Sequence, residues 1–324
     1  MAEEDESTRI LNETSTLDMV PLDVALFVLI GYFLYFVLII VGIPANLFVL
    51  IRMIHFKRRN PDTYRSGTGA CLLAMSVADL VSLISIAFFC LLSFNLPLPF
   101  NKTTYRVVCK ITVFCLHSAT SIAIWSWLLM SILRWLALYR PLLHHTLYNL
   151  PLKAVGVVCV MASLSNIWLL LTVDVDDNGS SCTQAWLFDS ELVTRALLLI
   201  EMSWSFIVPI LVVAYLDLST LYSIPRLLSA RYTHSLLSSD SHNAQNTHMK
   251  KSTKTLLRWL AIALVDILLN APENLLRLAT ILGFVNQMTM MTHGYIIFKT
   301  ISDVFYYSQY SFNAAYLALF IYDR

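Results

Sequence analysis

Residues 24–51 read VALFVLIGYFLYFVLIIVGIPANLFVLI and contain no charged side chain. The hydrocarbon core of a bilayer is roughly 30 Å thick, and a helix of about 20 apolar residues crosses it. This stretch is therefore long enough and apolar enough to span a membrane. Residues 1–23, before it, are acidic and lack the basic start and short apolar run of a secretory signal. We expect this first span to direct its own insertion.

The composition extends this interpretation to the whole chain. Hydrophobic residues make up 57% of the 324 positions and charged residues 13%, whereas about a quarter of the residues in a soluble domain are charged. A soluble fold could not bury this much apolar surface, so the surplus must face lipid. The net charge of +1 gives no excess that favours nucleic acid, and the six irregularly spaced cysteines form no zinc motif, so no metal site is expected.

Six further stretches are apolar over a similar length. With the first they predict an all-α membrane protein, a seven-transmembrane helix bundle within residues 24–322. The predicted spans are 24–51, 66–94, 111–133, 154–173, 196–216, 259–282 and 294–322. The last three spans hold most of the intramembrane charges, and such charges mark functional sites by default.

The basic residues predict the orientation of the bundle. Lys and Arg are concentrated after the first, third and fifth spans, and cytoplasmic loops carry such an excess. Residues 1–23 are therefore predicted to be an extracellular N-terminus and residues 223–258 the third cytoplasmic loop. Sequons for N-glycosylation begin at Asn12, Asn101 and Asn178, and all three fall on the predicted outside. We expect a multi-pass glycoprotein of the plasma membrane.

Polar and proline landmarks follow one another in a fixed order along these spans. Asp79 lies within Leu73–Leu80 (LAMSVADL), and Cys109 and Arg134 stand at the two ends of the third span. The remaining landmarks are Asn46, Trp168, Pro209, Pro272 and Asn313. In order and spacing these residues resemble those of the rhodopsin-like (class A) G protein-coupled receptors over nearly the whole chain. Within that family, the chain resembles a divergent member of the invertebrate peptide-receptor type.

The resemblance implies a receptor that is not an enzyme and that acts on a heterotrimeric G protein. It implies a disulfide between Cys109 and Cys182, which an oxidising exterior also favours. It places Arg134 and Trp135 where the G protein binds. The family's acidic residue before this arginine is Leu133 here, so we expect Asp217, at a similar depth in the fifth span, to hold Arg134 at rest. The alternative is that Arg134 has no role in coupling and is only one of the basic residues that are enriched on the cytoplasmic side of membrane proteins.

Asp79 is a lone carboxylate in an apolar span, so it must face the bundle interior and find polar partners. Asn46 and Asn313 are its neighbours in the family, where the three form a sodium-binding, activation-linked pocket. Ala123 replaces a family serine and removes one oxygen ligand. We expect a water-filled hydrogen-bonded group with a weak sodium site, and a purely structural group remains the alternative. No other cofactor is expected.

Charged and polar residues in the outer halves of four spans are the predicted ligand contacts. On the sixth span Asp266, Asn270, Glu273 and Arg277 share one helical face. By position in the family, the predicted ligand-binding set is His117, Thr120, Glu201, Glu273, Arg277, Lys299, Asp303 and Tyr307. The alternative is that Glu273–Arg277 and Lys299–Asp303 are ion pairs within their own helices, four residues apart, that only neutralise each other.

The resemblance also narrows the ligand. Leu116 stands where amine receptors carry an aspartate, and Tyr307 stands where opsins carry the retinal lysine. Acids and bases together fit a short neuropeptide best, and a polar-headed lipid or glycolipid pheromone is the second choice. Asn270, Leu133 and Ala314 depart from the family motifs, so a receptor-like protein that acts by dimerisation without coupling stays open. The absence of internal repeats and of an H-E-x-x-H motif argues against a transporter and an intramembrane enzyme.

Overall fold

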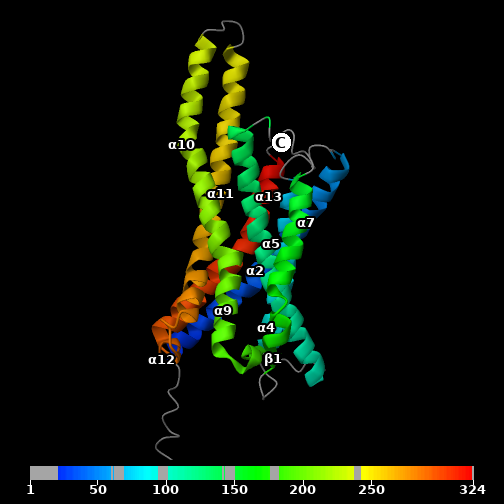
Figure 1. The fold of residues 1–324 in the computed structure, drawn as a ribbon, viewed down its shortest axis with the longest axis vertical. Coiled ribbons are helices and arrows are strands. Elements are labelled where there is room, and N and C mark those ends of the chain that lie inside the picture. Colours follow the sequence, from blue (N-terminus) through cyan, green and yellow to red (C-terminus); the bar gives the residue numbers. More distant parts are fainter. Residues whose placement is uncertain are drawn as a thin grey trace, which may run out of the picture.

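The computed structural model describes residues 21–59, 61, 69–93, 101–140, 142, 150–175, 182–236 and 242–322. Nearly all of these residues are helical, because a backbone in lipid can satisfy its N–H and C=O groups only within a helix or a closed barrel. The long helices run side by side as one elongated bundle (Figure 1). The fold is a seven-transmembrane helix bundle, as the sequence predicted.

The first three spans are single helices. They are α2 (Leu22–Arg59), α4 (Gly69–Ser93) and α5 (Lys102–Tyr139). Helix α5 is the centre of the bundle, since it packs against α4, α7 and α10. Helix α2 packs against α4 and against the last helix, so that the beginning and end of the chain meet along one side.

The fourth and fifth spans are each interrupted. The fourth consists of α7 (Leu150–Asn166) and the short α8 (Leu169–Thr172). The fifth consists of α9 (Glu191–Met202), the π-helical turn η2 (Ser203–Ile207) and α10 (Val208–Leu236). The π-helical turn ends just before Pro209, whose missing N–H already weakens the helical hydrogen-bond ladder there.

The sixth and seventh spans are α11 (His242–Ile281) and α13 (His293–Tyr322), joined through the short α12 (Gln287–Met290). Helices α10 and α11 continue beyond the other helices at one end of the molecule (Figure 1). Residues 223–236 and 242–258, predicted to be loop, are therefore helical, and residues 237–241 lie outside the described residues. Extending an existing helix costs little, since only its nucleation is unfavourable.

Among the described residues, five helical stretches are long and apolar enough to cross a membrane by length and composition alone. They are Leu22–Arg59, Gly69–Leu92, Lys102–Tyr139, Leu150–Thr172 and Glu191–Tyr222. Helices α11 and α13 are long enough but more polar. Helix α11 carries Asp266, Glu273 and Arg277 within its predicted span, and α13 carries Lys299 and Asp303.

The side chains are distributed as in a membrane bundle. Large apolar residues such as Leu26, Phe33 and Leu268 are exposed and face the position of lipid. The interior instead buries small and polar residues, among them Asn46, Asp79 and many serines. Small and hydrogen-bonding residues are typical of contacts between membrane helices, where they allow close packing.

A two-stranded hairpin closes the end opposite the α10–α11 extension (Figure 1). Strands β1 (Val173–Val175) and β2 (Cys182–Gln184) pair antiparallel, with Val175 opposite Cys182. A disulfide joins Cys182 to Cys109 on α5, with a Cα–Cα distance of 5.7 Å. This bond attaches the hairpin to the start of α5 and fixes it over the helix ends. The short 3₁₀ turn η1 (Leu187–Asp189) then leads into α9.

An ion pair adds a second attachment at this end. Arg106 Nε lies 2.6 Å from Asp174 Oδ1, and the Val175 amide donates to the same oxygen at 2.7 Å. The amide hydrogen bond and the Arg106 guanidinium hold the pKa of Asp174 below its ordinary value. Both side chains are close to half exposed, so the pair orients the hairpin and adds little stability.

Candidate functional site

A cavity of about 380 Å³ lies under the hairpin, between the outer halves of the helices. Strands β1 and β2 form its roof through Val173, Thr183 and Gln184. Its walls are mostly apolar, and its ionisable lining residues include His117, Glu273, Arg277 and Lys299. A mostly apolar pocket with a few convergent polar groups is the usual form of a small-ligand site, and this volume is near the lower end of the usual range of about 300–1,000 Å³.

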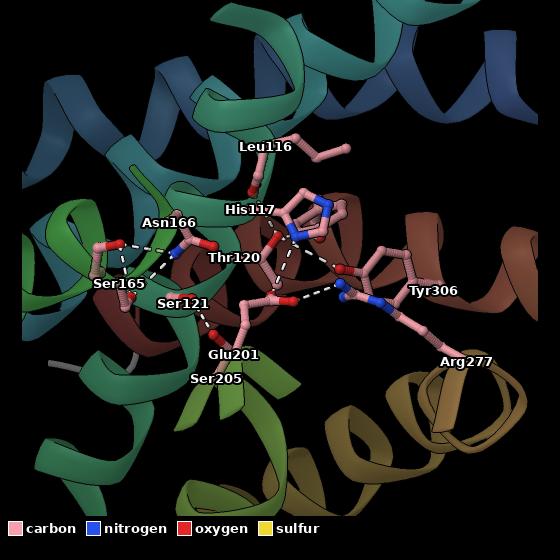
Figure 2. A network of polar contacts seen from close by, with 12 residues as sticks. Leu116, His117, Thr120, Ser121, Ser165, Asn166, Glu201, Ser205, Arg277 and Tyr306 are labelled. Atoms are coloured by element: carbon pink, nitrogen blue, oxygen red, sulfur yellow. Dashed lines mark hydrogen bonds and ion pairs between the residues drawn. The ribbon is translucent and has the colours of Figure 1, made fainter. Parts of the chain in front are cut away.

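Glu201, His117 and Arg277 form the first charged cluster at this cavity, called here the Glu201 cluster. The Glu201 side chain is only 2% exposed, and its two oxygens accept from different helices. One oxygen lies 3.2 Å from His117 Nδ1 on α5, and the other lies 2.5 Å from Arg277 Nη2 on α11. Figure 2 shows His117 and Arg277 directed towards the Glu201 carboxylate from two different sides. The cluster therefore joins α5, α9 and α11.

Lys299, Glu273 and Asp303 form the second charged cluster, called here the Lys299 cluster. Lys299 Nζ donates to Glu273 Oε1 at 2.7 Å and to Asp303 Oδ1 at 2.5 Å. The first bond crosses from α13 to α11, and the second joins residues four apart on α13. One ammonium group thus holds two carboxylates, and the cluster joins α11 to α13.

These contacts show which of the expected ion pairs within single helices form. The predicted Lys299–Asp303 pair within one helix is present. Within the described part of the chain, however, Arg277 pairs with Glu201 and Glu273 pairs with Lys299, so a Glu273–Arg277 pair does not form. The alternative of a pair within α11 is wrong because both side chains find partners on neighbouring helices.

The predicted ligand-binding set divides into lining and supporting residues. The residues of this set that line the cavity are His117, Glu273, Arg277 and Lys299. Glu201 and Asp303 do not line it but form ion pairs with the lining cations Arg277 and Lys299. Thr120 and Tyr307 do not line it either. The Thr120 hydroxyl bonds to the Leu116 carbonyl at 2.8 Å and to the Tyr310 hydroxyl at 2.9 Å. The Tyr307 ring packs edge-on against Tyr35.

A second, much smaller cavity of roughly 10 Å³ lies deeper in the bundle, about the size that holds one water molecule. Asp79, Asn313 and Asp266 are among its lining residues. Asp79 is fully buried, and neither of its carboxylate oxygens makes a hydrogen bond within the described residues. Asn46 does not line this cavity. Its amide instead donates to the Gly42 and Tyr310 carbonyls at 3.0 and 2.8 Å, which joins α2 to α13.

At the other end of α5, Arg134 lies against α10. Its Nη2 is 3.5 Å from Asp217 Oδ1 and donates to the Ser131 hydroxyl at 2.7 Å. Trp135 stacks on Tyr139, and the Tyr139 hydroxyl donates to the Ser219 carbonyl on α10. The structure thus brings together Arg134, Trp135 and Asp217, the three predicted coupling residues.

Several residues of these sites were not predicted from the sequence. Tyr295, Thr183 and Gln184 line the outer cavity. The two hairpin residues could have been inferred from their position next to Cys182. Gln309 bonds to the Asn270 amide across α11 and α13, and its place one helical turn before Asn313 was the available signal.

The predicted glycosylation sites are covered only in part. Asn101 precedes α5 and is exposed. Asn12 and Asn178 lie outside the described residues.

Comparison with known proteins gives one family and one relative. Residues 45–313 match the family described as 7 transmembrane receptor (rhodopsin family). The chain is also similar to the probable G-protein coupled receptor AH9.4 of Caenorhabditis elegans. The two are 22% identical over 326 aligned positions, which cover 88% of this chain and 88% of the relative.

Proposed function

Because the chain belongs to the rhodopsin family of seven-transmembrane receptors, we propose that it binds a short extracellular neuropeptide and signals to a heterotrimeric G protein. Members of this family are receptors of the plasma membrane and not enzymes. The coarse function, a multi-pass membrane receptor, therefore follows from the family. The peptide ligand and the coupling are our proposal.

The observation that supports the proposal most is the outer cavity. It holds acids and bases within apolar walls, under a hairpin that a disulfide fixes in place. A peptide offers such a cavity an apolar side chain, a charged group and backbone hydrogen bonds at once. Thr183 and Gln184 in the roof also line the cavity, and both are polar residues that can form hydrogen bonds with a peptide.

The two cations at the cavity favour the peptide over a lipid with an acidic head group. Arg277 is held by Glu201, and Lys299 is held by Glu273 and Asp303. An anionic head group would have to compete with these carboxylates for both cations. The lipid and glycolipid alternatives are therefore less well supported by the contacts.

Two observations support coupling at the cytoplasmic end. Arg134 is only 12% exposed and is held by Asp217 across α5 and α10. Such a pair can exist in a closed form and release Arg134 in an open one, and a ligand that binds the open form better shifts the equilibrium towards it. A separate part of the proposal concerns the deeper cavity. We propose that the fully buried Asp79, together with Asn313, binds a sodium ion weakly there.

The test is expression of the full chain in cells with second-messenger reporters, against a library of short peptides and small lipids. Ligand-dependent signalling that Arg134→Ala abolishes at equal surface expression supports coupling. Binding of a peptide without any second-messenger response contradicts coupling and favours a receptor-like protein that acts by dimerisation. A response to lipids but to no peptide contradicts the proposed ligand class.

A further inference from the structure

The two charged clusters at the outer cavity differ in their charge balance. In the Glu201 cluster one carboxyl group, that of Glu201, faces the Arg277 guanidinium and the His117 ring. In the Lys299 cluster one ammonium faces the carboxyl groups of both Glu273 and Asp303. The α11–α13 side of the cavity therefore has an excess of carboxyl groups over cations.

Glu273 is the part of this excess that a ligand can reach. It lines the cavity, whereas Asp303 does not. Glu273 Oε1 accepts from Lys299, and Glu273 Oε2 makes no hydrogen bond within the described residues. The Glu273 side chain is 16% exposed, and two carboxyl groups that share one ammonium attract a further cation, which a ligand in the cavity can supply.

We infer, building on the proposed function, that the ligand enters the outer cavity with a single cationic group, an ammonium or a guanidinium, which binds the Glu273 carboxylate. The walls beside this cation site are apolar, so the stem that carries the cation is apolar as well. The lining apolar side chains are Phe89, Val113, Leu169, Leu198, Leu276 and Ile281. An arginine or lysine side chain, or a peptide amino terminus next to an apolar residue, has this chemistry.

An anionic ligand group has no comparable place. Lys299 already donates to two carboxylates, and Arg277 already donates to the buried Glu201. A ligand carboxylate near either cation would also approach the carboxyl groups that this cation already holds. Figure 2 shows Arg277 directed at Glu201, and Glu201 is fixed on its other oxygen by His117.

The experiment uses acetylated tetrapeptide amides in matched sets that differ at one position. Arginine is compared there with citrulline, which has the same shape but no charge, and with glutamate. Binding to the detergent-purified full chain is read as a rise in melting temperature, which needs no G protein, and signalling is read in cells. We expect the active sets to contain arginine or lysine, and citrulline to weaken them about 10-fold to 100-fold, as for a charge-assisted hydrogen bond.

Three variants locate the effect. Glu273→Gln keeps the shape of the side chain and should bring the arginine-to-citrulline ratio close to one. Asp303→Asn removes the same charge from a residue outside the lining and should lower the ratio less. Glu191→Gln is the matched control, because Glu191 is 54% exposed and pairs with Arg195 on the same helix. It should leave the ratio unchanged.

The possible outcomes distinguish a failure of this inference from a failure of the proposed function. If citrulline or glutamate sets bind as tightly as arginine sets, the inference is wrong and the peptide receptor stands. If Glu273→Gln folds and keeps the full preference for arginine, Glu273 is not the cation site. Should Glu273→Gln fail to reach the cell surface, an unchanged ratio in Asp303→Asn overturns the inference. If no peptide binds or signals, both proposals are wrong.

Discussion

Replacing Asp217 by asparagine should raise signalling in the absence of ligand. Asp217 holds Arg134 between α10 and α5, and both side chains are only about one eighth exposed, at 13% and 12%. At their separation of 3.5 Å, two unit charges attract by about 5 kcal/mol at an effective dielectric constant of 20. Most of this attraction offsets the cost of removing both ions from water.

The part that distinguishes the closed from the open conformation is therefore smaller. We take about 1–2 kcal/mol, which is within the usual range of coupling energies between sites. This corresponds to about a 5-fold to 30-fold change in the ratio of open to closed receptor. Asp217→Asn should raise ligand-free second-messenger production by a factor in this range, while Asp217→Glu, which keeps the charge, should raise it much less.

The measurement is second-messenger level against receptor number at the cell surface, without ligand, for the unchanged chain and both variants. Unchanged or lower ligand-free signalling in Asp217→Asn at equal surface number would show that the pair does not hold the closed form. Arg134→Lys and Arg134→Ala provide the reference level. Signalling that depends on Arg134 should fall in these variants, whichever residue stands at position 217.

Leu133→Asp, which restores the family's acidic residue beside Arg134, is a poor test of the same idea. Leu133 is 8% exposed and packs with Met130, Ala263 and Ala314 in an apolar cluster between helices. A carboxylate there would lie in the apolar core, so that loss of folding would hide any effect on signalling.

Three further predictions follow from single contacts. Glu201→Gln leaves the Arg277 guanidinium without its charged partner beneath the outer cavity and should destabilise the receptor by about 3–5 kcal/mol, read as a lower melting temperature. Cys182→Ala releases the hairpin from Cys109 and should weaken peptide binding more than it weakens constitutive signalling, measured in parallel on one cell population. Gly42→Leu places a side chain against Ser311 and Leu83 and should cost about 1–3 kcal/mol of stability, whereas Gly156→Leu, where nothing lies within 4 Å, should cost nothing.

The spans and their order were predictable because hydrophobicity is a property of each segment alone. The disulfide was expected from the resemblance to the receptor family and from an oxidising exterior. The Arg134–Asp217 pair was predictable because depth along a helix can be counted from landmarks such as Pro209. Lys299–Asp303 was predictable because neighbours four apart on one helix lie on the same face. For these two pairs the spacing in the sequence contains the distance that matters.

The Glu201–Arg277 pair was not predictable in this way. It depends on how α9 and α11 are rotated towards each other, and the sequence spacing contains no such information. The rule for residues four apart gave Glu273 as the partner of Arg277 with equal local support. The deciding factor is burial: Glu201 is almost fully enclosed and could not remain unpaired, whereas Glu273 has Lys299 within 2.7 Å.

The pairings link the two ends of the receptor through a small set of helices. The Glu201 cluster joins α5, α9 and α11, the Lys299 cluster joins α11 to α13, and the Arg134–Asp217 pair joins α5 to α10, which continues α9. A ligand cation that binds Glu273 competes with Lys299 for that carboxylate, and it therefore weakens the contact between α11 and α13. Helix α11 also meets α13 deeper in the bundle through Asn270 and Gln309. Under the proposed function, α11 is the helix that the two charged clusters share, and the Glu201 cluster also reaches α5, which carries Arg134.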